Sequence, residues 1–173
     1  QAAFEISDYP THVDYEVAGV DGLKLAWLSA MADHLCAPVR ATIREIHQAK
    51  VEEGCRVWKL YNMGYVVKSK NHTIGFDIYP SMLGNAEIIS LADDLDILFV
   101  SHAHSDHFYP PLVEAMVRSG KKVVLPAHSR EKMATEFDLK NKDWEKNIFL
   151  LFENLEPLDV DGVAVRCFAG GQQ

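Results

Sequence analysis

The sequence has no long apolar segment, no excess of positive charge and no recognisable export signal. No apolar run approaches the roughly 18 residues that a membrane-spanning helix needs, and nothing resembles a signal peptide. We therefore expect a cytoplasmic protein with no membrane contact. Lys and Arg total 17 against 25 Asp and Glu, a net charge of −8. This balance argues against a nucleic-acid partner, because a large nucleic-acid footprint needs a basic face.

Cysteine is also scarce, with only Cys36, Cys55 and Cys167 in the chain. An odd, widely spaced set excludes a disulfide framework and a CxxC zinc site. We expect each cysteine to be a small core residue. The chain also lacks repeats and low-complexity segments. Its 173 residues, 48% hydrophobic and 24% charged, suit one core-bearing unit.

Hydrophobic periodicity predicts a helical N-terminal part followed by alternating strands and helices. Apolar residues recur every three or four positions over 25–50. Pro38 interrupts this stripe and predicts two consecutive helices or one kinked helix. Gly54 ends the helical part, which predicts an N-terminal helical extension over 1–54. Strands are expected near 55–61, 64–69, 73–78, 97–100, 122–126, 147–152 and 162–168, and helices near 84–94, 110–119 and 129–137.

The most informative residues are His102, His104, Asp106 and His107, which lie within six positions of one another. They follow the apolar strand predicted at 97–100, so they begin a loop on a rigid scaffold. The first two histidines are two residues apart and project to the same side of an extended segment. The aspartate and the last histidine are adjacent and diverge unless the chain turns. One loop could thus offer two imidazoles to one metal ion, and a carboxylate with an imidazole to a second.

Imidazole nitrogen and carboxylate oxygen suit Zn²⁺, with Mn²⁺ or Fe²⁺ as alternatives. Bound metal lowers the pKa of water from about 15.7 to about 7, and two metals about 3.5–4 Å apart could share the resulting hydroxide. The chemistry therefore predicts a zinc site, which could hold two ions, that carries a metal-bound hydroxide. The competing interpretation is a solvated, histidine-rich loop without metal.

The string Ser-His-Ala-His-Ser-Asp-His at 101–107 resembles the His-x-His-x-Asp-His motif of the metallo-β-lactamase fold superfamily. The segments 62–67 and 73–78, the second with Asp77 near its end, resemble that family's first strands. The segment from Phe108 onward resembles its lactonase-type branch, which is similar to ascorbate-6-phosphate lactonase. The resemblance covers about 55–173. It implies an α/β (α+β) fold in which these residues form the N-terminal half of a four-layer αββα sandwich.

The resemblance also implies roles for the motif residues. His102, His104 and His107 would hold metal, while Asp106 would ligate the second ion and accept or relay a proton as the catalytic residue. Asp77 would orient the loop by hydrogen bonding, as carboxylates behind metal ligands do. The alternative for Asp77 is a simple turn residue. Phe108 and Tyr109 are expected either to line the substrate pocket or to pack beneath the loop. Lone histidines elsewhere are expected to be surface or packing residues: His34, His47 and His72.

The chain also departs from the family pattern. The only later histidine, His128, follows its strand too soon, so we predict that it is not a ligand. The third ligand normally follows a later strand, which 163–168 resembles, with Cys167 on it. We therefore expect further ligands beyond Gln173 and interpret the chain as the N-terminal part of a longer protein. Its partner would be its own C-terminal half or a second chain, including a homo-oligomer.

These observations predict a metal-dependent hydrolase that attacks an ester, lactone or related bond of a small-molecule substrate. Two alternatives stay open. One is a nucleic-acid phosphodiesterase of the same fold, which would require a basic face. The other is a truncated, non-catalytic metal-binding module, in which the half-site binds metal weakly or not at all.

Overall fold

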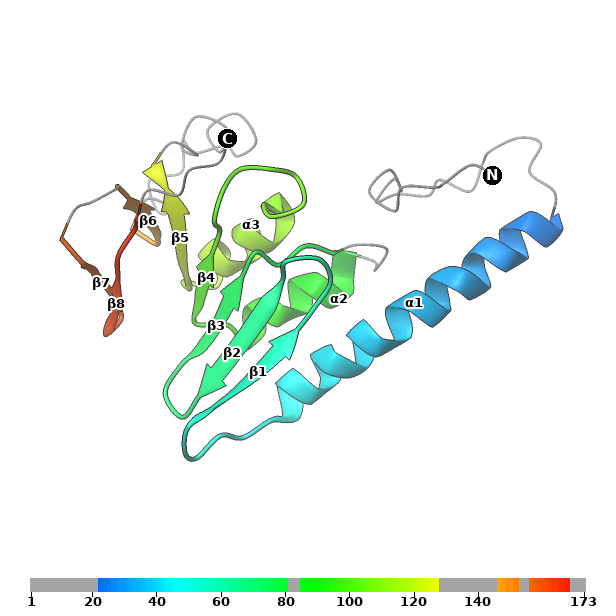
Figure 1. The fold of residues 1–173 in the computed structure, drawn as a ribbon, viewed down its shortest axis with the longest axis horizontal. Coiled ribbons are helices and arrows are strands. Elements are labelled where there is room, and N and C mark those ends of the chain that lie inside the picture. Colours follow the sequence, from blue (N-terminus) through cyan, green and yellow to red (C-terminus); the bar gives the residue numbers. More distant parts are fainter. Residues whose placement is uncertain (1–21, 81–84, 128–145, 153–155, 169–173) are drawn as a thin grey trace.

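A computed structural model describes residues 22–80, 85–127, 146–152 and 156–168. They form a mixed α/β fold around a six-stranded sheet, with a separate two-stranded hairpin (Figure 1). The described helices are α1 (Gly22–Gln48), α2 (Asn85–Ile89), the 3-10 helix η2 (Ser90–Asp93) and α3 (Pro110–Arg118). The sheet holds β1 (Cys55–Lys59), β2 (Tyr65–Ser69), β3 (Thr73–Phe76), β4 (Ile97–Phe99), β5 (Lys122–Pro126) and β6 (Ile148–Leu151), and the hairpin holds β7 (Leu158–Val160) and β8 (Val163–Val165).

The order of strands in the sheet follows their order in the chain. β1, β2 and β3 pair antiparallel, because tight turns connect them. From β3 to β6 the strands are parallel, and the connections from β3 to β4 and from β4 to β5 are helical crossovers that return the chain to the same end of the sheet. The segment with α2 and η2 joins β3 to β4, and α3 joins β4 to β5. The carboxyl ends of β3, β4 and β5 therefore lie next to one another at the same end of the sheet.

One face of the sheet packs against the helices and forms the larger hydrophobic core. Leu98 on β4 and Leu125 on β5 point to this side and are almost fully buried. Gly75 on β3 faces the same core closely, because a Cβ there would lie 2.7 Å from Ile78 Cδ1 and that side chain would have to shift. The helices contribute Ile43, Ile46, Ile88, Leu91, Leu112 and Met116 to the same core.

Helix α1 runs through Pro38 as one continuous helix. Of the two alternatives, two consecutive helices or one kinked helix, the structure therefore excludes the first. The physical reason is burial on both sides of the proline: Cys36 precedes it, Ile43 and Ile46 follow it, and all three lie in one core cluster. At the end of α1, His47 pairs with Asp94 and Lys68 Nζ donates to the Ile46 carbonyl at 3.0 Å. These contacts fix the helix end to η2 and β2.

The opposite face of the sheet is also apolar but only partly covered. The β7–β8 hairpin packs against its β4–β6 part, where Ile97, Val124 and Val160 are fully buried. Figure 1 shows the hairpin on the β5–β6 side, far from β1. Toward β1 the face is open, since Val57 is 60% exposed and Tyr65 is 40% exposed.

Several smaller expectations can also be compared with the structure. Cys36 is buried as expected, but Cys55 is exposed because it lies on the edge strand β1, and Cys167 is half-buried. The strand β7 was not anticipated. The helix expected at 129–137 lies outside the described residues. Of the helices that the structure describes, none has the length and apolar character that a bilayer crossing requires.

Candidate metal site at the end of strand β4

The histidine-rich loop begins directly after β4, whose Ile97 and Leu98 are buried. The first loop residue, Val100, is still held in the sheet by a hydrogen bond from its amide to the Val124 carbonyl at 3.0 Å. The chain then turns, because the His107 and Phe108 amides donate to the His104 carbonyl at 3.1 and 2.9 Å. This turn brings the second half of the motif back beside the first.

The four motif side chains lie in two adjacent pairs. His102 Nε2 lies 3.0 Å from His104 Nδ1, and His107 Nε2 lies 3.6 Å from Asp106 Oδ2. The ring centroids of His102 and His107 are 4.0 Å apart, which places the two pairs side by side. The loop thus presents two imidazole nitrogens together, and an imidazole nitrogen together with a carboxylate oxygen.

Asp77 links the end of β3 to this loop. Its carboxylate accepts three hydrogen bonds: from the Ser101 amide at 2.7 Å, from the Ser101 hydroxyl at 2.7 Å and from His107 Nδ1 at 2.9 Å. Its backbone adopts a left-handed conformation, with φ of 44°, which an aspartate tolerates better than most residues do. The residue therefore does more than end a turn, because it holds the orientation of His107.

Ser101 was not singled out from the sequence, yet it organises the loop. Its single hydroxyl proton goes to Asp77, since a carboxylate can only accept. The Ser101 oxygen, 2.9 Å from His102 Nδ1, therefore accepts a hydrogen bond from the N–H at that position. These hydrogen bonds assign the proton of both His102 and His107 to Nδ1. The Nε2 atom of each ring then carries a lone pair that can bind a metal ion.

Asn62 is the second functional candidate that sequence reasoning missed. It lies in the turn between β1 and β2, and its Nδ2 donates to Asp106 Oδ2 at 3.0 Å. The two residues are 44 positions apart, so no local pattern predicts the contact. The only sequence signal is the Asn-x-Gly string at 62–64, which is typical of a tight turn.

The local electrostatics favour neutral imidazole and ionised carboxylate. Burial lowers the pKa of His102, and the neighbouring His107 and His104 lower it further. Burial alone raises the pKa of Asp106. The hydrogen bond from Asn62, a backbone hydrogen bond and the nearby His107 and His102 outweigh this effect, so the pKa of Asp106 is lower than normal. These are the protonation states in which both groups bind metal.

Phe108 and Tyr109 pack beneath the loop, which decides between the two expectations for them. They are 2% and 7% exposed and belong to the helix-side core. Tyr109 contacts Tyr79 edge to face, with ring centroids 5.9 Å apart. Its hydroxyl has no hydrogen-bond partner within the described part of the chain. Burial, with a smaller contribution from Tyr79, raises the pKa of Tyr109 to about 12.

The other histidines lie away from the loop or outside the described residues. His34 is exposed on α1, and His72 is half-buried in the turn before β3. His47 pairs with Asp94, and its Nε2 lies 3.4 Å from Ser90 Oγ. His128 is not among the residues that the structure describes.

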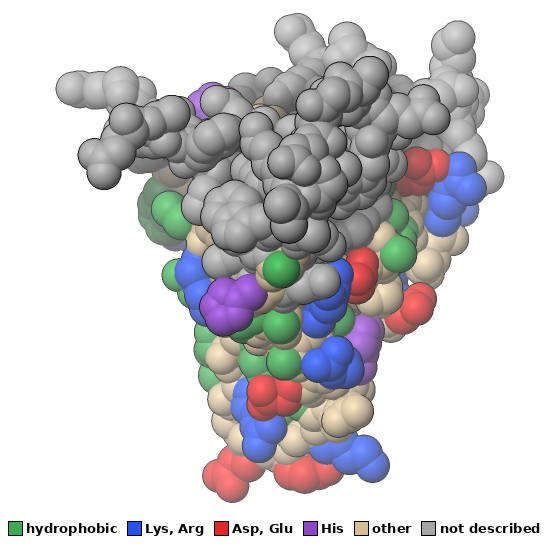
Figure 2. Space-filling view, turned by 90° about the vertical axis from the view of Figure 1, so that its right-hand side faces the viewer, with side chains coloured by type: hydrophobic (Ala, Val, Ile, Leu, Met, Phe, Trp, Pro, Cys, Tyr) green, Lys and Arg blue, Asp and Glu red, His purple; other side chains and the backbone are tan. Residues whose placement is uncertain are grey.

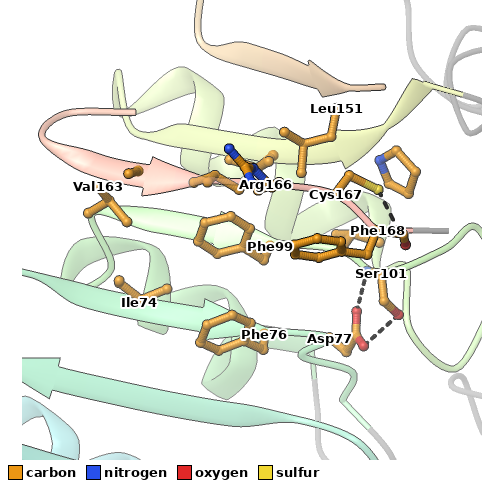
Figure 3. A pocket seen from close by; sticks show the side chains of 15 residues that line it. Ile74, Phe76, Asp77, Phe99, Ser101, Leu151, Val163, Arg166, Cys167 and Phe168 are labelled. Atoms are coloured by element: carbon orange, nitrogen blue, oxygen red, sulfur yellow. Dashed lines mark hydrogen bonds between the residues drawn. The ribbon is translucent and has the colours of Figure 1, made fainter. Parts of the chain in front are cut away.

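The loop borders the open face of the sheet. A groove of about 910 Å³ runs from Ser101, His102 and His107 over this face to Met63 and Phe152. Beside it, a cavity of about 550 Å³ separates the sheet from the β8 region. Figure 3 shows Phe76 and Phe99 along this cavity, with Asp77 and Ser101 hydrogen-bonded at one end. Cys167 lines both spaces.

Within the described residues, no three His, Cys, Asp or Glu side chains are grouped so that they could hold one metal ion. The motif instead supplies ligands in pairs. No protein-family model matches this sequence, and a search of curated proteins gave no significant match.

Proposed function

We propose that the loop after β4 holds two divalent metal ions, and that the protein is a hydrolase acting on an ester, lactone or related bond of a small-molecule substrate. The observation that carries this proposal is the arrangement of the motif side chains as two ligand pairs. His102 faces His104, and Asp106 faces His107. The proposal places the chain in the metallo-β-lactamase fold superfamily, in its lactonase-type branch.

The spacing within each pair fits a shared metal ion. Two nitrogens bound to one tetrahedral zinc, each about 2.0–2.1 Å from it, lie roughly 3.3 Å apart. The nitrogens of His102 and His104 are 3.0 Å apart. The His107 nitrogen and Asp106 oxygen are 3.6 Å apart. Each pair thus needs only a small shift to become one edge of a coordination tetrahedron.

The surrounding hydrogen bonds present the correct atoms. Ser101 and Asp77 bind the Nδ1 atoms of His102 and His107, so the Nε2 atoms point away from these partners and can bind metal. This donor set suits Zn²⁺, with Mn²⁺ or Fe²⁺ as alternatives. When bound, such a metal supplies Lewis acidity and a hydroxide nucleophile at neutral pH. Asp106, besides binding, accepts or relays a proton during hydrolysis.

A complete site needs more protein than these pairs provide. Catalytic zinc normally keeps three protein ligands, and the loop offers two to each ion. The apolar face next to the groove is only partly covered, which favours a further layer of sheet and helix over it, as in a four-layer αββα sandwich. We propose that a continuation of the chain or a second chain covers this face and supplies the remaining ligands.

One alternative function has a specific observation in its favour. Since no three ligand side chains are grouped in the described residues, the loop could serve a metal-binding module without catalysis. A nuclease is less well supported. On the face drawn in Figure 2, positive and negative side chains are interspersed over the described residues rather than gathered by sign.

Zinc titration of the purified protein tests the proposal. His104→Ala removes one ligand of the first pair, so we expect zinc affinity to fall by about tenfold or more. The matched control His72→Ala removes an imidazole outside the loop and should leave the affinity unchanged. Equal zinc affinity in all three proteins would show that the loop is not the metal site.

Activity then separates an enzyme from a binding module. A panel of lactones, thioesters and phosphodiesters is assayed before metal removal with a chelator, after it, and again after zinc is restored. The hydrolase proposal predicts turnover of at least one substrate that disappears and returns with the metal. Zinc binding without turnover would instead support the non-catalytic module.

A further inference from the structure

The turn between β1 and β2 carries a polar side chain that reaches the metal loop. Asn62 lies at its tip with φ of 51°. The turn is closed by hydrogen bonds from the Leu60 amide to the Gly64 carbonyl at 2.8 Å and from the Gly64 amide to the Tyr61 carbonyl at 2.9 Å. The backbone at position 62 is therefore held in a conformation that asparagine and glycine accept readily.

The same turn is packed against the end of β3. A Cβ at Gly64 would lie 3.1 Å from the Tyr61 carbonyl oxygen and 3.4 Å from the Asp77 carbonyl oxygen. The first distance is tight and concerns the turn's own backbone, whereas the second is an ordinary van der Waals contact that places the turn directly against Asp77. Because Asp77 itself binds His107 and Ser101, the turn and the metal loop share one rigid support.

Asp106 has few other restraints. Its side chain is 52% exposed, and besides a backbone hydrogen bond its carboxylate has the Asn62 hydrogen bond at 3.0 Å and His107 Nε2 at 3.6 Å. An exposed carboxylate without a fixed partner samples several rotamers and loses entropy when it binds a ligand. A donor on a rigid turn selects one orientation beforehand.

We infer that Asn62 is a positioning residue that holds the Asp106 carboxylate toward His107 Nε2 for metal binding. The inference rests on the proposed function. The amide suits this task because it donates a proton without adding charge. Each carboxylate oxygen has two lone pairs, so the bond from Asn62 leaves lone pairs free for a metal.

Three variants isolate the side chain from the backbone. Asn62→Gly keeps the left-handed turn but removes the amide. Asn62→Asp keeps the size and the turn preference but replaces the donor with a carboxylate that repels Asp106. Asn71→Gly, at an exposed position of the β2–β3 turn, is the matched control for a second asparagine lost from a turn.

The first measurement needs no metal. In the NMR spectrum of the metal-free protein, the Asn62 side-chain amide should shift when Asp106 is changed to Ala, and the Asn71 amide should not. An Asn62 amide signal that Asp106→Ala leaves unchanged would overturn the inference, whatever the protein binds.

The second measurement is zinc affinity by calorimetry, with thermal denaturation to verify folding. Asn62→Gly should weaken zinc binding by about tenfold, as residues behind metal ligands typically do. Asn62→Asp should weaken it at least as much, and Asn71→Gly should have no effect. If folded Asn62→Gly binds zinc as tightly as the wild-type protein, the inference is contradicted. If the wild-type protein binds no zinc, the proposed function is contradicted. The NMR measurement then shows by itself whether Asn62 holds Asp106.

Discussion

The two faces of the six-stranded sheet use the same strands but differ in how they are covered. On the helix side, Leu98, Val123 and Leu125 are at most 2% exposed. On the opposite side the hairpin buries Val124, while Phe76 next to the metal loop stays 37% exposed. Strand β4 is apolar at every position, Ile-Leu-Phe, as is typical of strands buried on both faces. The difference indicates a sheet whose second face is built to be covered, and the candidate site lies at the edge of that face.

A pair of matched leucine truncations gives the largest expected contrast between the faces. Leu98→Ala on the helix side should destabilise the protein by about 2–5 kcal/mol, because it leaves a cavity in a closed core. Leu151→Ala on the hairpin side removes the same atoms from a half-buried position and should cost about 1 kcal/mol or less. Urea denaturation measures both. Similar losses in the two variants would mean that the second face is already closed in solution.

Tyr109, which lies in the helix-side core, should make the stability of the protein depend on pH. The expected effect is smaller than that of Leu98→Ala. The pKa of Tyr109 is raised to about 12 in the folded state, against about 10 in an unfolded chain. Between these pH values the unfolded chain releases the proton and the folded chain keeps it, so rising pH favours unfolding. This group should cost about 1.4 kcal/mol per pH unit from pH 10 to 12.

Tyr109→Phe should remove that part of the alkaline loss. At neutral pH it should be neutral or stabilising by about 1 kcal/mol, because the buried hydroxyl has no partner among the described residues. Denaturation of both proteins at pH 7 and across pH 10–12 checks this. If Tyr109→Phe destabilises the protein at pH 7, the hydroxyl has a bonding partner.

The smallest effect on stability is expected on the open face near β1. Val57→Lys changes a side chain that is 60% exposed and should alter stability by no more than about 0.5 kcal/mol. It should nevertheless reduce self-association, since exposed apolar patches drive contacts between molecules. Sedimentation at increasing protein concentration measures this. The control Asn71→Lys adds the same charge in an exposed turn. If it reduces self-association equally, the effect of Val57→Lys comes from charge alone.

Local patterns predicted most of the regular elements well. The strand at 122–126 and the helix beginning at Pro110 were placed correctly, because strict apolar patterns and a pair of prolines mark them. At Pro38, where the sequence left two helices or one kinked helix open, the chain forms one helix because burial of Cys36 and Ile43 outweighs the local preference of proline. The short strand β7 carries an exposed aspartate among three residues and gives almost no periodic signal.

The candidate site divides in the same way. The four motif residues and Asp77 could be identified from spacing and resemblance, because they lie in or beside short recognisable strings. Ser101 and Asn62 could not, since their roles depend on contacts between β3, β4 and the β1–β2 turn. A hydrogen bond that spans 44 positions follows from the sheet's strand order, which no local pattern reveals.

The pairing of β3 with β4 also limits how the chain length can vary. Phe76 pairs with Phe99 across the two strands. One position after Phe76, the Asp77 carboxylate accepts a hydrogen bond from the Ser101 amide. An inserted or deleted residue within β3 would move the carboxylate by about 3.3 Å and turn it to the other face of the sheet. Gly75 adds to this constraint, since a Cβ at this position would lie 2.7 Å from Ile78 Cδ1 and force that side chain to shift. We therefore expect proteins that share this site to differ in the length of the 78–96 connection. The number of residues between positions 75 and 77 should be the same in all of them.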